Sequence, residues 1–191
     1  MTDKEKQSNG ELYNPTAMDI CEMRMHGTKL VNEFNSCSDG KKQIEILRNL
    51  FGNMGSNVRV NRPFTTDFGC HTFIGDDVVI NINCTFLDAA EIKIGNRVLI
   101  GSDVKMYTTF HPNHTNDRFV SSKGENYYLT QAKPIVIGDD TWICGNVTIV
   151  PGVHIGKNVV IGAGSVVTKD IPDGVIAAGN PCKVIRENTR N

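Results

Sequence analysis

Two histidines stand three positions apart in the segment Phe110-His111-Pro112-Asn113-His114. The imidazole of histidine titrates near neutral pH, so a histidine in such a segment suits general acid–base chemistry. His111 and His114, together with His71, also suit the three-histidine ligand set of a zinc ion. A third interpretation is an ordinary exposed loop histidine with no chemical role. The histidines by themselves leave these alternatives open.

The cysteines give no sign of a metal site or a redox pair. None of the six has a partner at CxxC spacing, so neither a zinc ribbon nor a redox dithiol is indicated. We expect reduced thiols that pack as small hydrophobic side chains. The six are Cys21, Cys37, Cys70, Cys84, Cys144 and Cys182.

The composition argues against two classes of partner. The formal net charge is −1, 21% of the residues are charged, and no basic run occurs, so neither nucleic acid nor a membrane surface is indicated. The N-terminal stretch MTDKEKQSNGELYNP is polar and lacks the apolar core of a signal peptide, and no later apolar run could span a membrane. We therefore predict a cytoplasmic protein.

The first part of the chain predicts helices. Residues 1–15 are polar, and we expect them to be disordered or loosely attached. Apolar residues then recur at helical spacing from Met18 to Phe34, with a weak point at Gly27, and again from Gln43 to Met54. Ser38-Asp39-Gly40 between them predicts a turn and a helix start. Residues 1–55 are therefore interpreted as an N-terminal helical segment.

From residue 56 an aliphatic or similar residue recurs every six positions. This period fits neither an α-helix nor a hairpin meander, but it fits a solenoid in which each flat face takes one hexapeptide. The aliphatic side chain points into the core, and the Gly or Asn that follows it turns a corner. We predict a mainly β parallel β-helix over residues 56–186 and a tail at 187–191. The repeating positions are Phe68, Ile74, Ile80 and Phe86, then Ile94, Ile100 and Met106, then Ile137, Ile143, Ile149, Ile155, Ile161 and Val167.

The repeat fails at two places. Between Phe86 and Ile94 the period slips by two residues. A polar excursion from about residue 108 to about 133 then interrupts the register between Met106 and Ile137, and it contains His111. A long excursion inside a compact repeat protein usually carries function. We therefore expect the chemistry at this inserted loop.

The repeat and three shorter motifs together resemble a known family. The stretch IVIGDDTWICGNVTIVPGVHIGKNVVIGAGSVVTKDIPDGVIAAGNPCKVIRE, residues 135–187, is similar to the hexapeptide-repeat acyltransferases. With GELY…EFN, HPNH and GNPCKVIR added, the chain resembles the maltose and galactoside O-acetyltransferase family from about Gly10 to Arg186, and the maltose branch more closely. The resemblance implies a left-handed β-helix, a homotrimer with active sites between adjacent subunits, and acetyl transfer from acetyl-coenzyme A to a sugar hydroxyl without a metal.

Two residues match the catalytic positions of that family. The resemblance places the general base at His111, the histidine that precedes proline in the loop, and such a base is worth about 10²–10⁴ in rate. It places a transition-state asparagine at Asn81, whose amide can donate to the oxyanion or orient the acceptor hydroxyl. An asparagine that merely turns a corner is the alternative for Asn81.

The acceptor pocket implied by the resemblance contains Asn81, two carboxylates and an arginine. Asp67 and Asp88 suit the gripping of sugar hydroxyls, although solvated turn residues are the alternative, and Arg24 completes the pocket. The galactoside enzymes tend to carry Ser at the first of these positions and a second acidic residue at the position of Ala89. Pro15 lies near the place of the family's N-terminal acceptor Asp, so the sequence leaves the sugar's identity open.

For coenzyme A, the resemblance implies a groove along the regular coils. Small residues let the pantetheine arm approach the backbone, and cations meet the phosphates. A solvated basic tail is the alternative for the cations. The implied residues are Trp142, Gly145, Ala163, Thr168, Lys169, Lys183 and Arg186.

Other functions remain open at this point. The acceptor of an acetyltransferase of this kind can be an amino sugar, serine or an antibiotic instead of a simple sugar. A zinc enzyme like the gamma-class carbonic anhydrases would use His71, His111 and His114 as metal ligands. A non-catalytic β-helix scaffold would need none of these residues.

Overall fold

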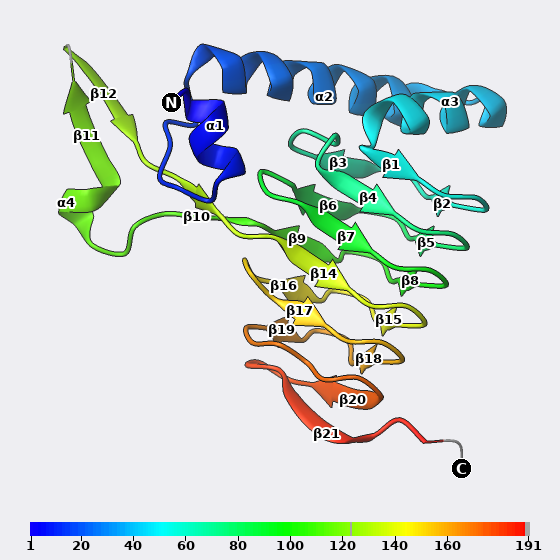
Figure 1. Ribbon diagram of the computed structural model, residues 1–191. Helices are drawn as coiled ribbons and strands as arrows, with labels where there is room; N and C mark the ends of the chain where they lie inside the picture. The colour runs from blue at the N-terminus through cyan, green and yellow to red at the C-terminus, as the bar shows by residue number, and fades with distance from the viewer. Residues whose placement is uncertain (123, 190–191) are drawn as a thin grey trace.

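Isoleucine and valine at every sixth position form short strands with one side chain turned inward and its neighbour outward. Ile143, Ile149 and Ile161 are buried, whereas Trp142 beside Ile143 is exposed. Three such strands make one coil, and the coils stack into a tall prism with helices across its N-terminal end (Figure 1). This computed structural model describes residues 1–122 and 124–189. The chain is thus a mainly β solenoid with an N-terminal helical segment.

Stacking of the coils gives three parallel sheets, to which only the last strand is added antiparallel. The first sheet contains β1 (Asn53–Met54), β4 (Thr72–Ile74), β7 (Ile92–Ile94), β14 (Ile135–Ile137) and β17 (His154–Ile155). The second contains β2 (Arg59–Val60), β5 (Val79–Ile80), β8 (Leu99–Ile100), β15 (Trp142–Ile143), β18 (Val160–Ile161), β20 (Val175–Ala178) and β21 (Lys183–Glu187). The third contains β3 (Phe64–Thr66), β6 (Cys84–Leu87), β9 (Lys105–Tyr107), β16 (Thr148–Ile149) and β19 (Val166–Val167).

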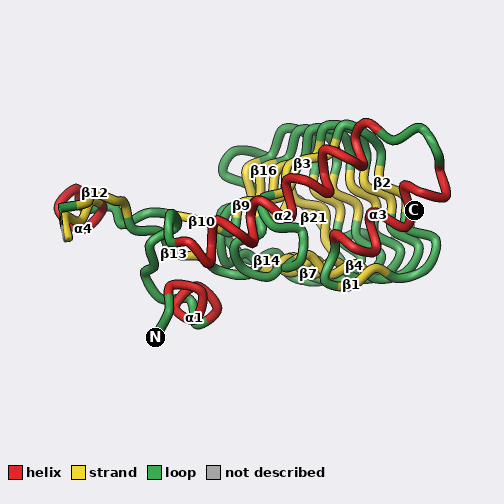
Figure 2. The backbone as a smooth tube through the Cα atoms, turned by 90° about the horizontal axis from the view of Figure 1, so that it is seen from above, coloured by secondary structure: helices red, strands yellow, loops and turns green. Residues whose placement is uncertain are grey.

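The coil is left-handed. Viewed from the N-terminal end, the chain passes from the first sheet to the second and then to the third in a counterclockwise sense while it moves away from the viewer (Figures 1 and 2). The family resemblance implies this hand, whereas the general preference for right-handed crossovers favours the opposite one.

The two-residue slip in the repeat is a property of one corner of the prism. In the first sheet Ile74 pairs with Ile94, 20 positions on, whereas Ile137 pairs with Ile155, 18 positions on. The shorter coil of 18 residues consists of three hexapeptides, one for each sheet. The extra two residues of the longer coil lie between Leu87 and Ile92, at the corner that joins the third sheet to the first.

The core is a single column of aliphatic and aromatic side chains along the prism axis. Along the third sheet Phe64, Phe86, Met106 and Ile149 are all fully buried. Burying each side chain of this size contributes about 1.5–3 kcal/mol, so the column is the main source of stability. Phe68 is an exception to the predicted pattern, because it leaves the column and packs in a separate small cluster.

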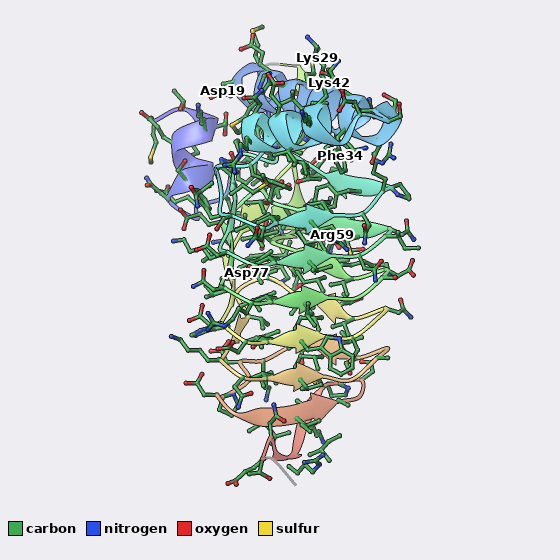
Figure 3. All side chains as sticks on the ribbon, turned by 90° about the vertical axis from the view of Figure 1, so that its right-hand side faces the viewer. Asp19, Lys29, Phe34, Lys42, Arg59 and Asp77 are labelled. Atoms are coloured by element: carbon green, nitrogen blue, oxygen red, sulfur yellow. The ribbon has the colours of Figure 1, made fainter. Side chains whose placement is uncertain are left out.

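Two helices close the N-terminal end of the prism, α2 (Met18–Ser36) and α3 (Gly40–Leu50). The buried ring of Phe34 lies beneath them, whereas Lys29 and Lys42 lie on their outer side (Figure 3). The predicted helix start at Ser38-Asp39-Gly40 is confirmed: α3 begins at Gly40, and the Asp39 carboxylate caps its first turn by accepting from the backbone N–H groups of Lys41 and Lys42. It ends at Leu50, so the predicted boundary at Met54 was wrong.

Gly27 does not weaken α2. A Cβ atom there would lie 2.3 Å from the carbonyl oxygen of Phe68, so the glycine lets the helix pack directly on the coil that it covers. The close approach offsets the low helix propensity of glycine.

The prediction of a disordered or loosely attached stretch at residues 1–15 was wrong. Residues Asp3–Ser8 form helix α1, which begins with a capping box between Thr2 and Glu5. Tyr13 is 1% exposed and forms an antiparallel bridge with Thr130. We call residues 3–15 the N-terminal arm.

The inserted loop projects sideways from the prism, and its short elements are β10 (Thr109–Phe110), α4 (Thr115–Arg118), β11 (Phe119–Ser122), β12 (Glu125–Tyr128) and β13 (Gln131–Ala132) (Figure 1). Strand β10 pairs with β13, and β11 pairs with β12, in each case antiparallel. Among the described residues, every helix is too short or too polar to cross a membrane.

Candidate active site

The inserted loop is closed at its base by backbone hydrogen bonds. Lys133 N–H donates to the Thr108 carbonyl oxygen over 2.8 Å where the loop leaves and rejoins the coil. Strands β10 and β13 extend this closure outward, with Phe110 paired to Gln131. His111 follows β10 directly and therefore sits just beyond a firmly paired base.

The His111 ring is exposed and is oriented by the returning arm of the loop, at Tyr128 and Leu129. Its Nδ1 atom lies 2.9 Å from the carbonyl oxygen of Leu129, and the Tyr128 ring packs edge-on with centroids 5.4 Å apart. A carbonyl oxygen can only accept, so Nδ1 carries the proton. In the neutral ring Nε2 is then the nitrogen with the free lone pair, which is the state that a general base requires.

The other two histidines of the zinc hypothesis are held elsewhere. His71 Nδ1 lies 2.8 Å from the Asp88 carbonyl oxygen. Burial by itself lowers the pKa of His71, but hydrogen bonds to Cys70 and to that carbonyl outweigh burial and raise it. His114 occupies the N-cap position of α4 without a side-chain cap hydrogen bond. Within residues 1–122 and 124–189, the structure gathers no group of three His, Cys, Asp or Glu side chains able to hold a metal ion.

Asn81 lies at the corner between the second and third sheets. Its Oδ1 atom accepts from the Ile82 backbone N–H at 2.8 Å and from Asn61 Nδ2 at 3.4 Å. These two bonds fix the amide so that Nδ2 carries the donors that remain. A half-buried, oriented N–H donor is suited to an oxyanion. The sequence offered a corner residue as the alternative, and the geometry is compatible with both uses.

Gly145 and Ala163 lie at the same corner as Asn81, on later coils. Successive coils are joined there by backbone hydrogen bonds, such as Asp103 N–H to the Ile82 carbonyl, Asn146 N–H to Ser102, and Gly164 N–H to Gly145. We call this column of turns the corner edge; it consists of residues 81–83, 101–103, 144–146 and 162–164. The structure thus brings Asn81 into line with two of the residues expected to meet coenzyme A.

The corner edge contains small residues for two different reasons. A Cβ atom on Gly101 would lie 2.6 Å from the Gly145 backbone nitrogen, so this glycine is needed for the coils to stack. A Cβ atom on Gly145 would meet only the Ser102 carbonyl oxygen, at 3.4 Å. The coil therefore has room for a larger residue at Gly145, and its smallness leaves space for a ligand.

The remaining residues expected at coenzyme A fall into two groups. Trp142, 49% exposed, lies on the outer face of the second sheet, and the exposed Lys183 and Arg186 lie on β21 of that sheet. Thr168 and Lys169 are exposed and follow β19 at the far end of the third sheet. Trp142, Lys183 and Arg186 therefore lie on the same sheet, the second. Thr168 and Lys169 lie apart from them, where the chain leaves the third sheet.

Arg24 and Asp67 form an ion pair between α2 and the first coil. Arg24 Nε lies 3.1 Å from Asp67 Oδ1, and the guanidinium also donates to the Pro15 carbonyl and lies 5.2 Å from the Phe68 ring centroid. Burial raises the pKa of the Asp67 carboxyl, Arg24 opposes this, and Asp88 adds to it. Arg24 also lines an open groove of about 630 Å³ along α2. Both side chains of the pair are partly exposed, and Arg24, which lines the groove, is able to bind polar ligand groups there.

Asp88 is fully buried and does not face that groove. Its carboxylate accepts from Thr66 Oγ1 at 2.7 Å, from the Phe68 backbone N–H at 2.9 Å and from Thr72 Oγ1 at 3.0 Å. These bonds connect the longer corner, between Leu87 and Ile92, to the preceding coil, which contains Thr66, Phe68 and Thr72. The expectation that Asp88 grips the acceptor is therefore corrected: its oxygens are engaged inside the protein, and the residue supports the corner next to Asp67.

Sequence reasoning missed the groups that orient His111. The Leu129 carbonyl gives no sequence signal, because any residue supplies a backbone carbonyl. Tyr13 belongs to the GELY motif, but the motif does not show that its backbone pairs with Thr130. Only the fold brings these positions, far apart in sequence, to one place.

Within one chain the two expected catalytic side chains lie on different sides of the prism. His111 follows β10, which projects from the corner between the third and first sheets, whereas Asn81 follows β5 in the second sheet (Figure 1). Within one chain, the elements that carry His111 and Asn81 are therefore separated.

Family models match two separate parts of the chain. Residues 134–169 match the model described as bacterial transferase hexapeptide (six repeats). Residues 6–55 match the model described as maltose acetyltransferase hexapeptide capping motif. The two matches cover regular coils and the helical cap that closes them.

Similar proteins span nearly the whole chain. The galactoside O-acetyltransferase of Escherichia coli is 41% identical over 93% of this chain and 85% of its own length. The crystal structure of a maltose O-acetyltransferase from Clostridium difficile superposes with a TM-score of 0.92 and 38% identity, covering 100% of this chain and 99% of that one. A hexapeptide-repeat acetyltransferase from Vibrio cholerae complexed with acetyl-coenzyme A has a TM-score of 0.88 and 37% identity, with 100% of both chains covered.

Proposed function

The chain belongs to the maltose and galactoside O-acetyltransferase family, and from that premise we propose that it moves an acetyl group to a hydroxyl of a sugar. It is an acetyl-coenzyme A-dependent acyltransferase, as its named relatives and the acetyl-coenzyme A complex of a similar structure indicate. The sugar acceptor and the roles of individual residues are the proposed part.

Transfer is direct and begins at His111. Nε2 takes the proton of the acceptor hydroxyl while the oxygen attacks the thioester carbonyl carbon. When the tetrahedral intermediate collapses, the carbon–sulfur bond breaks and the imidazolium returns the proton to the coenzyme A thiolate. Atoms and charge balance without a metal or a covalent enzyme intermediate. Asn81 Nδ2 donates to the oxyanion, a contribution of about 3–4 kcal/mol for donors of this kind.

The observation that carries this proposal is the hydrogen bond from His111 Nδ1–H to the Leu129 carbonyl. It fixes the tautomer in which Nε2 is free to accept a proton, and an idle loop histidine needs no such arrangement. Arg24, which lines an open groove along α2 and pairs with the partly exposed Asp67, would supply a polar group for an acceptor with several hydroxyls.

We further propose a homotrimer in which adjacent subunits complete each site. The separation of His111 from Asn81 within one chain supports this arrangement, because a second subunit can bring its Asn81 to the loop of the first. The projecting loop also exposes two large apolar side chains, Phe119 at 62% and Tyr128 at 39%. A neighbouring subunit would cover such surface. Trp142, Gly145 and Ala163, with the basic residues beyond them, would line the coenzyme A groove.

A panel of acceptors tests the substrate class. Thiol release from acetyl-coenzyme A is followed with maltose, glucose and a thiogalactoside, and in parallel with an amino sugar, serine and a hydroxyl-bearing antibiotic. Saturable turnover with the sugars alone supports the proposal. Turnover only with an amine, serine or the antibiotic overturns the sugar assignment, and stoichiometric zinc in the purified protein would reopen the metal hypothesis. Absence of both turnover and acetyl-coenzyme A binding would indicate a non-catalytic scaffold.

A further inference from the structure

The N-terminal arm forms a backbone bridge with the segment that orients His111. Tyr13 N–H donates to the Thr130 carbonyl at 2.9 Å, and Thr130 N–H donates back to the Tyr13 carbonyl at 3.0 Å. Next to this bridge, Gln131 Nε2 donates to the Gly10 carbonyl at 2.6 Å. The segment 129–132 therefore lies between two partners, with the arm along one edge and β10 along the other.

This middle segment, together with Tyr128 just before it, supplies the groups around the His111 ring. Leu129 gives the carbonyl at 2.9 Å from Nδ1, Thr130 places its Oγ1 at 3.4 Å from the same atom, and Tyr128 packs against the ring. Because the ring is exposed, its orientation depends on these neighbours. A shift of the segment by a fraction of an ångström would change the Nδ1–carbonyl distance directly.

The arm is anchored by a buried side chain. Tyr13 packs in the small cluster that also contains Ile20, Phe68, Ala89 and Ala132, apart from the main column. Its hydroxyl accepts from Gln7 Nε2 at 3.4 Å. Ala132 belongs to β13 itself, so the cluster fixes the arm and the segment 129–132 together.

We propose that the N-terminal arm positions the catalytic base, with Tyr13 as the positioning residue. The buried ring fixes the arm, the arm backbone fixes Thr130 and with it Leu129, and the Leu129 carbonyl fixes the Nδ1–H tautomer of His111. The inference rests on the proposed function, because it assumes that His111 is the base. It gives a role to the arm that closure of the prism does not explain, because α2 and α3 provide that closure.

Substitution of Tyr13 in the full-length protein separates positioning from simple support of the fold. Tyr13→Ala empties the anchor, and we expect kcat to fall about tenfold or more while the KM for acetyl-coenzyme A stays within about twofold, because the arm contains none of the residues assigned to coenzyme A. Tyr13→Phe keeps the ring and should restore kcat. Ile20→Ala is the matched control, since it truncates a side chain in the same cluster that makes no bond to the 129–132 segment; it should lower the melting temperature without the fall in kcat.

Two further readouts connect the effect to His111. With ¹⁵N-labelled histidine, the His111 nitrogens should report the Nδ1–H tautomer in the unaltered protein and a mixture in Tyr13→Ala. On a His111→Ala background, Tyr13→Ala should cost no further activity, because the group that it positions is already gone. If Tyr13→Ala does not fold, Gln131→Ala loosens the same contact without touching the buried ring and should show a smaller effect in the same direction.

The outcomes distinguish the two proposals. Full activity of His111→Ala would overturn the base assignment itself. Loss of activity in His111→Ala, combined with normal kcat in Tyr13→Ala, would overturn only the positioning role. An equal loss from Tyr13→Ala on both backgrounds, or an equal fall in kcat in Ile20→Ala, would also overturn it.

Discussion

His111 and His114 stand three positions apart, yet the structure holds them differently. His111 Nδ1 lies 2.9 Å from the Leu129 carbonyl oxygen, whereas His114 is the N-cap residue of α4 and makes no side-chain cap bond. His111→Ala should therefore lower kcat about 10²–10⁴-fold, the usual effect of removing a general base. The thermal midpoint should change little because the ring is exposed. Steady-state thiol-release kinetics measure the first effect and thermal unfolding the second.

His114→Ala is the matched control on the same loop. It removes an imidazole from the same loop, but the His114 side chain makes no cap hydrogen bond to α4. We therefore expect kcat to stay within about twofold of the unaltered protein. Equal losses in both variants would mean that the loop as a whole, and not the oriented imidazole, supports the reaction.

The sequence predicted the solenoid well because its physical cause is local and repeated. An aliphatic residue at every sixth position buries itself in the column in coil after coil, so errors at single positions hardly matter. The one misassigned position, Phe68, lies next to the longer corner, where the hexapeptide count no longer holds. Left-handedness is not readable from this pattern and came from the family resemblance.

The candidate site was less predictable because it depends on contacts between distant residues. A loop that interrupts the repeat drew attention to His111, but the carbonyl that orients it carries no residue-type signal. Asp88 shows the opposite error: the family resemblance implied that it grips the acceptor, whereas the fold turns its carboxylate inward to three donors. Whether a carboxylate faces a pocket or a backbone N–H is decided by tertiary packing.

Gly145 provides a test of the coenzyme A groove that the fold itself should tolerate. A methyl group there has only the Ser102 carbonyl nearby, at 3.4 Å, so Gly145→Ala should fold with a nearly unchanged thermal midpoint. If the pantetheine arm runs along the corner edge, the methyl group occupies its space, and the KM for acetyl-coenzyme A should rise about tenfold or more, equivalent to about 1.4 kcal/mol. Titration calorimetry with coenzyme A checks the binding directly.

Gly101 supplies the contrast at the same corner. There a methyl group would lie 2.6 Å from the Gly145 backbone nitrogen, so Gly101→Ala should separate two coils and lower stability by about 1–3 kcal/mol. An unchanged KM in Gly145→Ala, with the fold intact, would show that the ligand does not follow this edge.

Asp88→Ala should be a stability variant. Truncation removes the acceptor for two threonine hydroxyls and leaves the Phe68 backbone N–H without its partner inside the protein. A buried donor that loses its partner costs about 1–3 kcal/mol, and the cavity adds to this loss. Urea unfolding at pH 7 measures it. Stability equal to that of the unaltered protein would contradict the supporting role assigned to this carboxylate.

Ionisation of the Tyr13 hydroxyl should lower the free energy of unfolding at alkaline pH. Burial is the largest cause that raises the pKa of Tyr13 to about 12, from 10.0 for the free side chain. Between these values the unfolded chain loses the phenol proton while the folded chain keeps it, so stability declines from about pH 10 and the contribution is lost as pH rises through about 12. The difference amounts to roughly 2–3 kcal/mol. Tyr13→Phe cannot ionise, so its free energy of unfolding should fall less steeply over this window. Urea unfolding of both proteins between pH 9 and about pH 12 measures the two slopes, and parallel slopes would mean that the phenol reaches water in the folded state.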